Sequence, residues 1–401
     1  MIERELTLRN LSPLALHAER SRAQFTPGLD YIPGSALRGA VAACYLQSHG
    51  PDDDFQALFV AGQASFADLL PATDRRAGRL LPATARLCKR YSWDHAQSLT
   101  DSLLRLALAD ELKRVDPLEE ETWTLCPEEK CPEYRIKRDR ASGYVISDYR
   151  QIQRVQTTKR LLTGTSINRA TGTTQSGMLF SQEAIEEGHC FRGVVRIAGD
   201  DDAADSLSRR LESVLQVGGW LRIGAGRSRG LGLVEIVDWS DPWPGPSLEA
   251  RWSSFNQAVA ALWRRYGAEP EKACFSLTLE SHLLLRDEAQ WPVSRLEKRA
   301  DLGSLLGLEG VALKRHVIQS AIVRGWNAQQ GLPKEDEPAL GRGSVFFFSV
   351  ETADETAVRQ RLAEIEAEGL GRRRAEGFGR VSVCDPFHYA FVIQEMQEAK
   401  R

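Results

Sequence analysis

The chain has 401 residues, enough for two or three domains, and its 42% hydrophobic and 27% charged residues are typical of globular proteins and exclude a disordered chain. The formal net charge is −3, so a nucleic-acid surface has to come from local clusters of basic residues. The charged N-terminus is unlike a signal peptide and no apolar run is long enough to span a bilayer, so we expect a cytoplasmic protein without membrane contacts.

The first elements expected are a strand at residues 5–9 and a helix that begins near residue 34. The strand follows from alternating polar and apolar residues. Residues 31–43 read Tyr-Ile-Pro-Gly-Ser-Ala-Leu-Arg-Gly-Ala-Val-Ala-Ala, which predicts a turn that opens into a helix of small residues. Because a helix N-terminus attracts anions, Ser35 and Arg38 are candidate contacts for an anionic ligand such as a phosphate group.

Charge is distributed unevenly in the middle of the chain. Residues 110–133 hold nine acidic and three basic side chains, which is most simply a solvated face beside a helix. Residues 135–174 hold nine basic and two acidic side chains together with many Thr, Ser and Gly, a composition typical of an extended arm that touches phosphates. The candidate RNA contacts in this arm are Lys159, Arg160, Asn168 and Arg169.

The seven cysteines are odd in number and scattered, which argues against a disulfide framework and leaves clustered cysteines as metal candidates. Cys126 and Cys131 lie on one short turn, Cys88 lies upstream, and His95 lies between Cys88 and that pair. Zinc takes four nitrogen or sulfur ligands in a tetrahedron. His95 is the fourth candidate by composition alone, and the alternative is an insert with free cysteines.

The strongest organisational signal is an internal repeat of strand, helix, glycine-rich segment and strand. The strands are expected at 191–197 and 345–350, the helices at 204–217 and 356–368, the glycine-rich segments at 218–232 and 369–379, and the closing strands at 233–237 and 380–384. Gly230 and Gly232 match Gly377 and Gly379 at one offset of 147 residues. An earlier strand in each copy, at 5–9 and at 275–280, completes two α+β modules of the split βαβ type.

The region between the two modules is rich in Pro and Trp at 238–246 and continues into a helix at about 248–266. We therefore expect an N-terminal module at 1–240, a linker and helix at 241–270, and a C-terminal module at 271–401.

The glycine-rich segments do not fit the common nucleotide-binding motifs. A dinucleotide fingerprint needs a strand before its glycines and a helix after them, whereas the order here is reversed, and neither segment has the Gly-Lys-Ser/Thr of a P-loop. Glycine lets the main chain approach a ligand, and arginine offers a planar fork to phosphate oxygens. The simpler alternative is a tight turn with solvated arginines. The candidate RNA contacts are Arg222, Gly224, Gly226, Arg227, Arg229, Arg372, Arg373 and Arg374, with Arg315 in addition.

The Ile-Pro-Gly-Ser-Ala-Leu-Arg-Gly element at 32–39, taken with the late glycine-rich segment of the same module, resembles the RAMP superfamily of CRISPR-associated proteins. Residues 163–180 resemble the thumb hairpin of that superfamily, and the two-module layout is similar to the five-type subunit of type III-D complexes. The resemblance implies an α+β fold of two ferredoxin-like, RRM-like modules, with a Cys-containing insert at about 84–150 and a thumb at about 153–177.

The resemblance also implies a function. It implies a noncatalytic RNA-binding subunit of a type III effector ribonucleoprotein in antiviral defence, which holds the 5′ handle of the CRISPR RNA. The expected partners are the large signalling subunit, the backbone RAMP subunits, and target RNA near the thumb. It further implies that Cys88 is a ligand of a structural zinc.

The alternative is a RAMP endoribonuclease that processes precursor CRISPR RNA. Metal-independent cleavage needs a positioned general base and acid, most often histidine. Of the seven histidines, the candidates considered are His17, His189 and His316, and none of these three stands in a pattern with an acidic partner. We therefore expect no catalysis.

Overall fold

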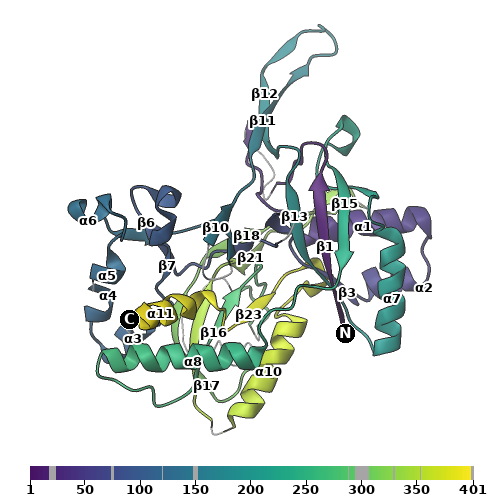
Figure 1. The fold of residues 1–401 in the computed structure, drawn as a ribbon. Helices are drawn as coiled ribbons and strands as arrows, with labels where there is room; N and C mark the ends of the chain where they lie inside the picture. The colour runs from purple at the N-terminus through teal and green to yellow at the C-terminus, as the bar shows by residue number, and fades with distance from the viewer. Residues whose placement is uncertain are drawn as a thin grey trace.

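The structure is a computed structural model, and it describes residues 1–17, 24–73, 76–119, 121–147, 152–287, 289–293, 307–327, 330–352 and 354–398 (Figure 1). The end of the expected insert, residues 148–150, lies outside these ranges. None of the helices in the described part of the chain is both long and apolar enough to cross a membrane. The chain forms a mixed arrangement of helices and strands built around two separate antiparallel sheets.

The first sheet has the strand order β14–β15–β1–β13–β3. The bounds are Trp220–Arg222 for β14, Leu233–Ser240 for β15, Ile2–Asn10 for β1, Cys190–Ile197 for β13 and Ala64–Phe66 for β3, with β4 (Leu70–Ala72) also paired to β13. Helices α1 (Gly34–Ser48) and α7 (Asp201–Val214) bury their apolar side chains with those of this sheet in one core. The Asp200 carboxylate accepts from the Ala203 amide and caps α7, as expected for an N-cap aspartate.

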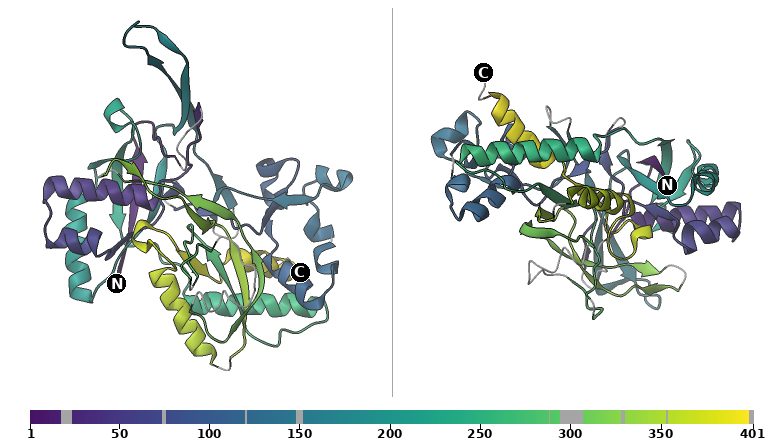
Figure 2. Two further views of the ribbon diagram at one scale, coloured as in Figure 1. Left: turned by 180° about the vertical axis from the view of Figure 1, so that it is seen from behind. Right: turned by 90° about the horizontal axis from the view of Figure 1, so that it is seen from below.

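The second sheet has the order β17–β22–β16–β23. The two sheets share one arrangement: β1 lies between β15 and β13 in the first, as β16 lies between β23 and β22 in the second. The bounds are Val311–Val317 for β17, Val345–Val350 for β22, Cys274–Leu279 for β16 and Val381–Val383 for β23. Figure 2 shows α8 (Leu248–Arg265) and α10 (Glu355–Glu368) on one side of this sheet. Every residue of β16 and β22 is buried, including Ser276 and Thr278 of the alternating strand β16, and the apolar run Val345–Phe348 of β22 suits this burial on both faces.

The insert of the N-terminal half packs against the second sheet, near the C-terminus of the chain (Figure 1). Leu103, Leu104 and Leu108 of α3 (Leu103–Leu112) belong to the core of that sheet. The other elements of the insert are β6 (Ala85–Cys88), the 3-10 helix η2 (Ser92–Ser98), β7 (Thr100–Asp101), α4 (Asp116–Glu119), α5 (Glu121–Thr124), α6 (Lys130–Tyr134), β8 (Arg138–Arg140) and β9 (Tyr144–Ser147). Two strands just outside its expected bounds, β5 (Arg79–Leu80) and β10 (Ile152–Val155), pair with β9.

A hairpin of β11 (Lys159–Ile167) and β12 (Thr174–Ile185) projects from the body of the protein (Figure 1). It differs in its bounds from the segment 153–177 that resembles a thumb, because residues 152–155 form β10 and pair with β9 of the insert. Outside these units lie β2 (Phe25–Thr26), α2 (Asp53–Phe55), the π-helix η1 (Gln56–Val60), β18 (Ser320–Val323), β19 (Trp326–Asn327), β20 (Leu332–Pro333), β21 (Glu337–Leu340) and α11 (Phe387–Glu398).

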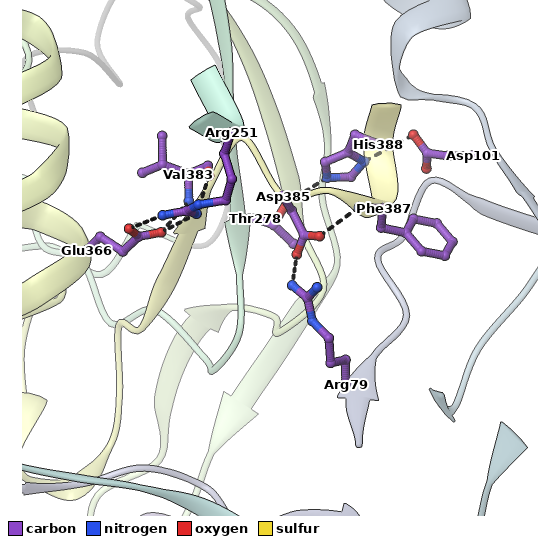
Figure 3. Close-up of polar contacts among 9 residues, drawn as sticks. All are labelled: Arg79, Asp101, Arg251, Thr278, Glu366, Val383, Asp385, Phe387 and His388. Carbon is purple, nitrogen blue, oxygen red and sulfur yellow. Dashed lines mark hydrogen bonds and ion pairs between the residues drawn. The ribbon is translucent and has the colours of Figure 1, made fainter. Parts of the chain in front are cut away.

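Buried polar contacts fasten the insert to the second sheet (Figure 3). Arg79 Nη2 lies 2.5 Å from Asp385 Oδ2, and His388 Nδ1 lies 3.0 Å from Asp101 Oδ2. The Thr278 hydroxyl lies 2.7 Å from the other nitrogen of His388. Because Asp385 and His388 of the C-terminal half meet Arg79 and Asp101 of the N-terminal half, separating the two would leave these groups without their partners.

Candidate functional site

The first glycine loop, residues 223–232, connects β14 to β15 through the 3-10 turn η3 (Arg227–Arg229). Its ends are joined by the Ile223 amide, which donates to the Gly232 carbonyl at 2.8 Å. A Cβ atom on Gly232 would lie 2.1 Å from the Ile223 carbonyl oxygen, so the closure requires glycine. Gly226 and Gly230 flank the turn in the left-handed region, with φ of 72° and 85°.

Three arginines surround this loop without a counter-charge. Arg222, Arg227 and Arg229 are all exposed. Arg222 Nη1 donates to the Arg227 carbonyl oxygen at 3.4 Å, and within the described part of the chain no carboxylate pairs with any of the three. A glycine backbone edged by uncompensated guanidinium groups has the donors and the positive charge that phosphate oxygens require.

The short segment Leu14–Ala15 holds this loop beside the base of the hairpin. The Ala225 amide donates to the Ala15 carbonyl at 2.9 Å, and Leu14 exchanges backbone hydrogen bonds with Ile185 of β12. The first glycine loop and the β11–β12 hairpin are therefore neighbours. The apolar sequence at Leu14 and Ala15 carries no signal that would have predicted this junction.

The hairpin carries four of the predicted RNA contacts, and the structure separates them into two pairs. At its base, Lys159 Nζ lies 2.5 Å from Asp30 Oδ1, and Arg160 pairs with Glu187. At its tip, the Asn168 side chain accepts from the Ala170 amide and shapes the turn, while Arg169 is exposed. The charges at the base are compensated within the chain.

The second glycine loop, residues 370–379, repeats the first one atom for atom at the closure. The Leu370 amide donates to the Gly379 carbonyl at 2.8 Å, as Ile223 does to Gly232. Its 3-10 turn η4 (Arg374–Glu376) is flanked by left-handed Arg373 and Gly377, with φ of 58° and 89°. The loop itself is docked on β3 of the first sheet, where the Ser65 hydroxyl donates to the Arg374 carbonyl at 2.7 Å.

The arginines of the second glycine loop are paired with carboxylates. Arg373 lies 2.7 Å from Glu337 and 2.8 Å from Glu376, and its side chain is only 15% exposed. Arg372 lies 3.4 Å from Glu337, and Arg374 lies 3.3 Å from Glu368. The positive charges of this loop are therefore paired with carboxylates of the same chain.

The N-terminus of α1 lies against the second glycine loop, not against the loop of its own half. A Cβ atom on Gly34 would lie 2.0 Å from the Phe66 carbonyl oxygen and 2.7 Å from that of Glu376. The guanidinium of Arg38 donates to the Phe59 carbonyl and lies 5.9 Å from the centre of its ring, and half-buried Ser35 stands one residue after Gly34. Elsewhere, Arg315 is paired with Asp110 at 3.0 Å.

Cys88, His95, Cys126 and Cys131 come together in the insert, with all four ligand atoms within 4.8 Å of one another. The sulfurs of Cys88 and Cys131 are 3.8 Å apart, and His95 Nδ1 lies 3.5 Å from the Cys126 sulfur and 3.3 Å from the Cys131 sulfur. A tetrahedral site with zinc–sulfur bonds of about 2.3 Å has sulfurs about 3.8 Å apart. The donor set and its spacing therefore fit a metal ion.

The surroundings of this cluster also fit a cation. Burial, together with the neighbouring sulfurs of Cys126 and Cys88, raises the pKa of the Cys131 thiol to about 12. At Cys88 burial also raises the pKa, but backbone amides of Tyr91 and Arg90 outweigh it, and the pKa is lowered overall. The ring of Tyr91 stacks on His95 at 4.4 Å between centres and fixes the orientation of the imidazole.

The contacts of Thr278, His388 and Asp101 follow the order of a nucleophile, a base and an orienting acid (Figure 3). His388 is 1% exposed and Thr278 is 5% exposed, so a substrate does not reach either of them. This triad acts as a structural link between the insert and the second sheet.

Several solved structures resemble this chain at low sequence identity. One chain of a type III-B Cmr-beta complex bound to cognate target RNA is 14% identical with a TM-score of 0.46, over 94% of this chain and 96% of that one. A chain of Cmr-beta bound to target RNA and AMPPnP is 14% identical with a TM-score of 0.44, over 91% and 89%. Oligomeric Cmr4 from Pyrococcus furiosus is 14% identical with a TM-score of 0.28, over 61% and 100%.

No curated protein matches the sequence. The family profile described as the RAMP superfamily matches residues 7–235, which is more than half of the 401 residues. The matched region contains most of the first sheet, the projecting hairpin, the cysteine cluster and the first glycine loop. The chain belongs to the RAMP superfamily.

Proposed function

We propose that this chain is a noncatalytic RNA-binding subunit of a type III CRISPR effector ribonucleoprotein. In this proposal it has the III-D five-type role: it holds the 5′ handle of the CRISPR RNA and contacts the large signalling subunit and the backbone RAMP subunits. The observation that carries the proposal is the first glycine loop, where Arg222, Arg227 and Arg229 have no carboxylate partner among the described residues.

The chemistry of this loop suits the sugar–phosphate backbone. Arginine forks contact phosphate oxygens, and a Cβ atom on Gly230 would meet nothing within 4 Å, so the main chain there is open to a strand of RNA. A subunit that serves many guides has to hold the backbone, because the guide bases differ from complex to complex. The loop therefore grips RNA independently of the guide sequence.

The test is RNA binding as a function of salt. Arg227→Ala and Arg229→Ala are each expected to flatten the slope of log K against log salt by about 0.7, the value for one phosphate contact on a single strand. The matched controls are Arg372→Ala and Arg374→Ala at the second glycine loop, whose charges are already paired. The proposal fails if the first pair leaves both affinity and slope unchanged.

The absence of catalysis is part of the proposal and is supported by the placement of His17. Burial lowers its pKa, one ring nitrogen bonds to the Glu183 backbone, and Nε2 is buried without a partner. Incubation of the purified chain with repeat-containing RNA should leave the RNA intact. Cleavage that His17→Ala or His189→Ala abolishes would favour the alternative, a RAMP endoribonuclease.

We further propose that the cluster of Cys88, His95, Cys126 and Cys131 holds one structural zinc. Zinc supplies folding free energy directly when its ligands are ordered around it, so Cys126→Ser should lose metal and local order together. Cys44→Ser is the control, because Cys44 lies in α1 outside the cluster. Zinc content below about a tenth of an equivalent in protein purified without chelator would overturn this assignment.

We assign both sheets to ferredoxin-like RAMP modules, on the strength of their shared strand order, and the β11–β12 hairpin to the thumb. A two-stranded ribbon with exposed faces gains order from a partner, and here the partner is target RNA. Limited proteolysis of the free chain should cut first within the hairpin, and bound RNA should protect it. Equal protection with and without RNA would refute the thumb assignment.

A further inference from the structure

Trp220 is a large aromatic side chain that the fold leaves in solvent next to the first glycine loop. It opens the edge strand β14, and its side chain is 66% exposed. Leu221, the next residue, is 2% exposed and lies in the core beneath the first sheet. Because side chains alternate along a strand, Trp220 and Arg222 both point to the opposite, uncovered face.

The charges around the indole change sign along the strand. Glu235 lies directly opposite Trp220 on β15, and Arg9 of β1 lies next to Glu235 in the same row. Arg222 stands two residues further along β14, about 7 Å away. Its guanidinium bonds to the Arg227 carbonyl and so joins the cluster of uncompensated arginines.

This arrangement fits one nucleotide in one direction. Phosphate is drawn to Arg222 and the arginines of the loop, which lie at one end of β14. The base attached to that phosphate then reaches the indole face. We propose that Trp220 is a base-stacking platform, on which the base of a nucleotide lies while Arg222 and Arg227 hold its phosphate.

The inference rests on the proposed RNA-binding role and extends it from the phosphate to the base. Stacking is tolerant of sequence, because every base has an aromatic face, so it suits a subunit that holds RNA of constant and variable sequence alike. The cations beside Trp220 favour RNA over a protein partner, since the loop offers an anion-binding surface continuous with the indole.

The experiment measures the affinity of the full chain for two single-stranded RNAs of equal length, one ordinary and one with abasic riboses throughout. Trp220→Ala should weaken binding of the ordinary RNA by about fivefold to one-hundredfold, the range for loss of one stacked base. Trp220→Phe should keep most of the affinity. Trp243→Ala is the matched control, because Trp243 is 85% exposed in the linker, away from the arginines.

Abasic RNA separates stacking from a structural effect. With this RNA, wild type and Trp220→Ala should bind equally and with the same salt slope, because only phosphate contacts remain. The inference would be overturned if Trp220→Ala lost the same affinity for both RNAs, or if it lost no affinity for ordinary RNA. The second result would instead indicate that the indole contacts a protein partner. If wild type binds neither RNA, the proposed function fails as well. If the arginine variants weaken binding but Trp220→Ala does not, the proposed function stands and the stacking inference alone falls.

Discussion

The two glycine loops have the same backbone and opposite surroundings. In each, a left-handed residue, a 3-10 turn and a left-handed glycine follow one another, and one amide closes the loop. The first glycine loop exposes its arginines, whereas the second rests on Phe66 and pairs its arginines with carboxylates. A repeated loop that exposes its arginines to solvent in one copy thus serves as an internal joint in the other.

This contrast between the two loops means that arginines between glycines do not by themselves define a binding site. What matters is whether the guanidinium groups already have partners, because a paired charge gains little from a phosphate. Glu337 and Glu376 make this difference for the second glycine loop. No carboxylate in the described ranges takes this part for Arg227 or Arg229.

The largest expected effect comes from alanine at equivalent glycines. Gly230 and Gly377 have φ of 85° and 89°, so a side chain costs each about 1 kcal/mol through the left-handed backbone. A Cβ atom on Gly377 would also lie 2.2 Å from the Phe66 carbonyl oxygen, whereas nothing lies within 4 Å at Gly230. Gly377→Ala should therefore cost about 3 kcal/mol or more of unfolding free energy.

Urea unfolding followed by circular dichroism, with Gly230→Ala as the matched variant, measures this difference. Equal losses for the two variants would mean that the docking of the second glycine loop on β3 does not contribute to stability.

A smaller effect is expected from Glu337→Gln. Glu337 is 14% exposed and accepts from both Arg372 and Arg373, so its loss leaves a largely buried guanidinium with Glu376 alone. We expect a loss of about 2 kcal/mol of unfolding free energy, as for hydrogen bonds to charged groups. Glu235→Gln, beside the first glycine loop, should change stability by less than about 0.5 kcal/mol. Equal changes in unfolding free energy for the two glutamine variants would contradict the contrast between the two glycine loops.

The smallest expected effect is a loss of stability at acidic pH. Burial raises the pKa of Glu376, but Arg373 and Lys334 outweigh it and hold the pKa below the ordinary value of 4.5. The folded state therefore binds this proton more weakly than the unfolded state, and the ion pairs contribute stability above pH 4.5 that is lost as the pH falls through the lowered pKa.

The Tm of wild type should fall more than that of Glu376→Gln when the pH is lowered from neutral to below 4.5. Parallel falls in Tm would show that the pairing of the second glycine loop does not depend on Glu376.

Much of the fold follows from local patterns in the sequence. The strands expected at 5–9, 191–197, 275–280 and 345–350 are found as β1, β13, β16 and β22, because period-two alternation and continuous apolar runs are local properties. The helix expected at 248–266 is found at Leu248–Arg265. The cysteine cluster was also predictable from composition, although only the fold brings Cys88 within 3.8 Å of Cys131.

The repeat and its glycine loops can be predicted from the residues alone, because a left-handed backbone and a close carbonyl approach demand glycine wherever the loop is placed. Which of the two loops exposes its arginines depends on contacts made in the folded chain. Ser65 and Arg374 are 309 positions apart along the chain, and Arg373 meets Glu337 across a separation of 36. Whether an arginine meets a carboxylate or solvent depends on such contacts between distant segments, and no local pattern of residues encodes them.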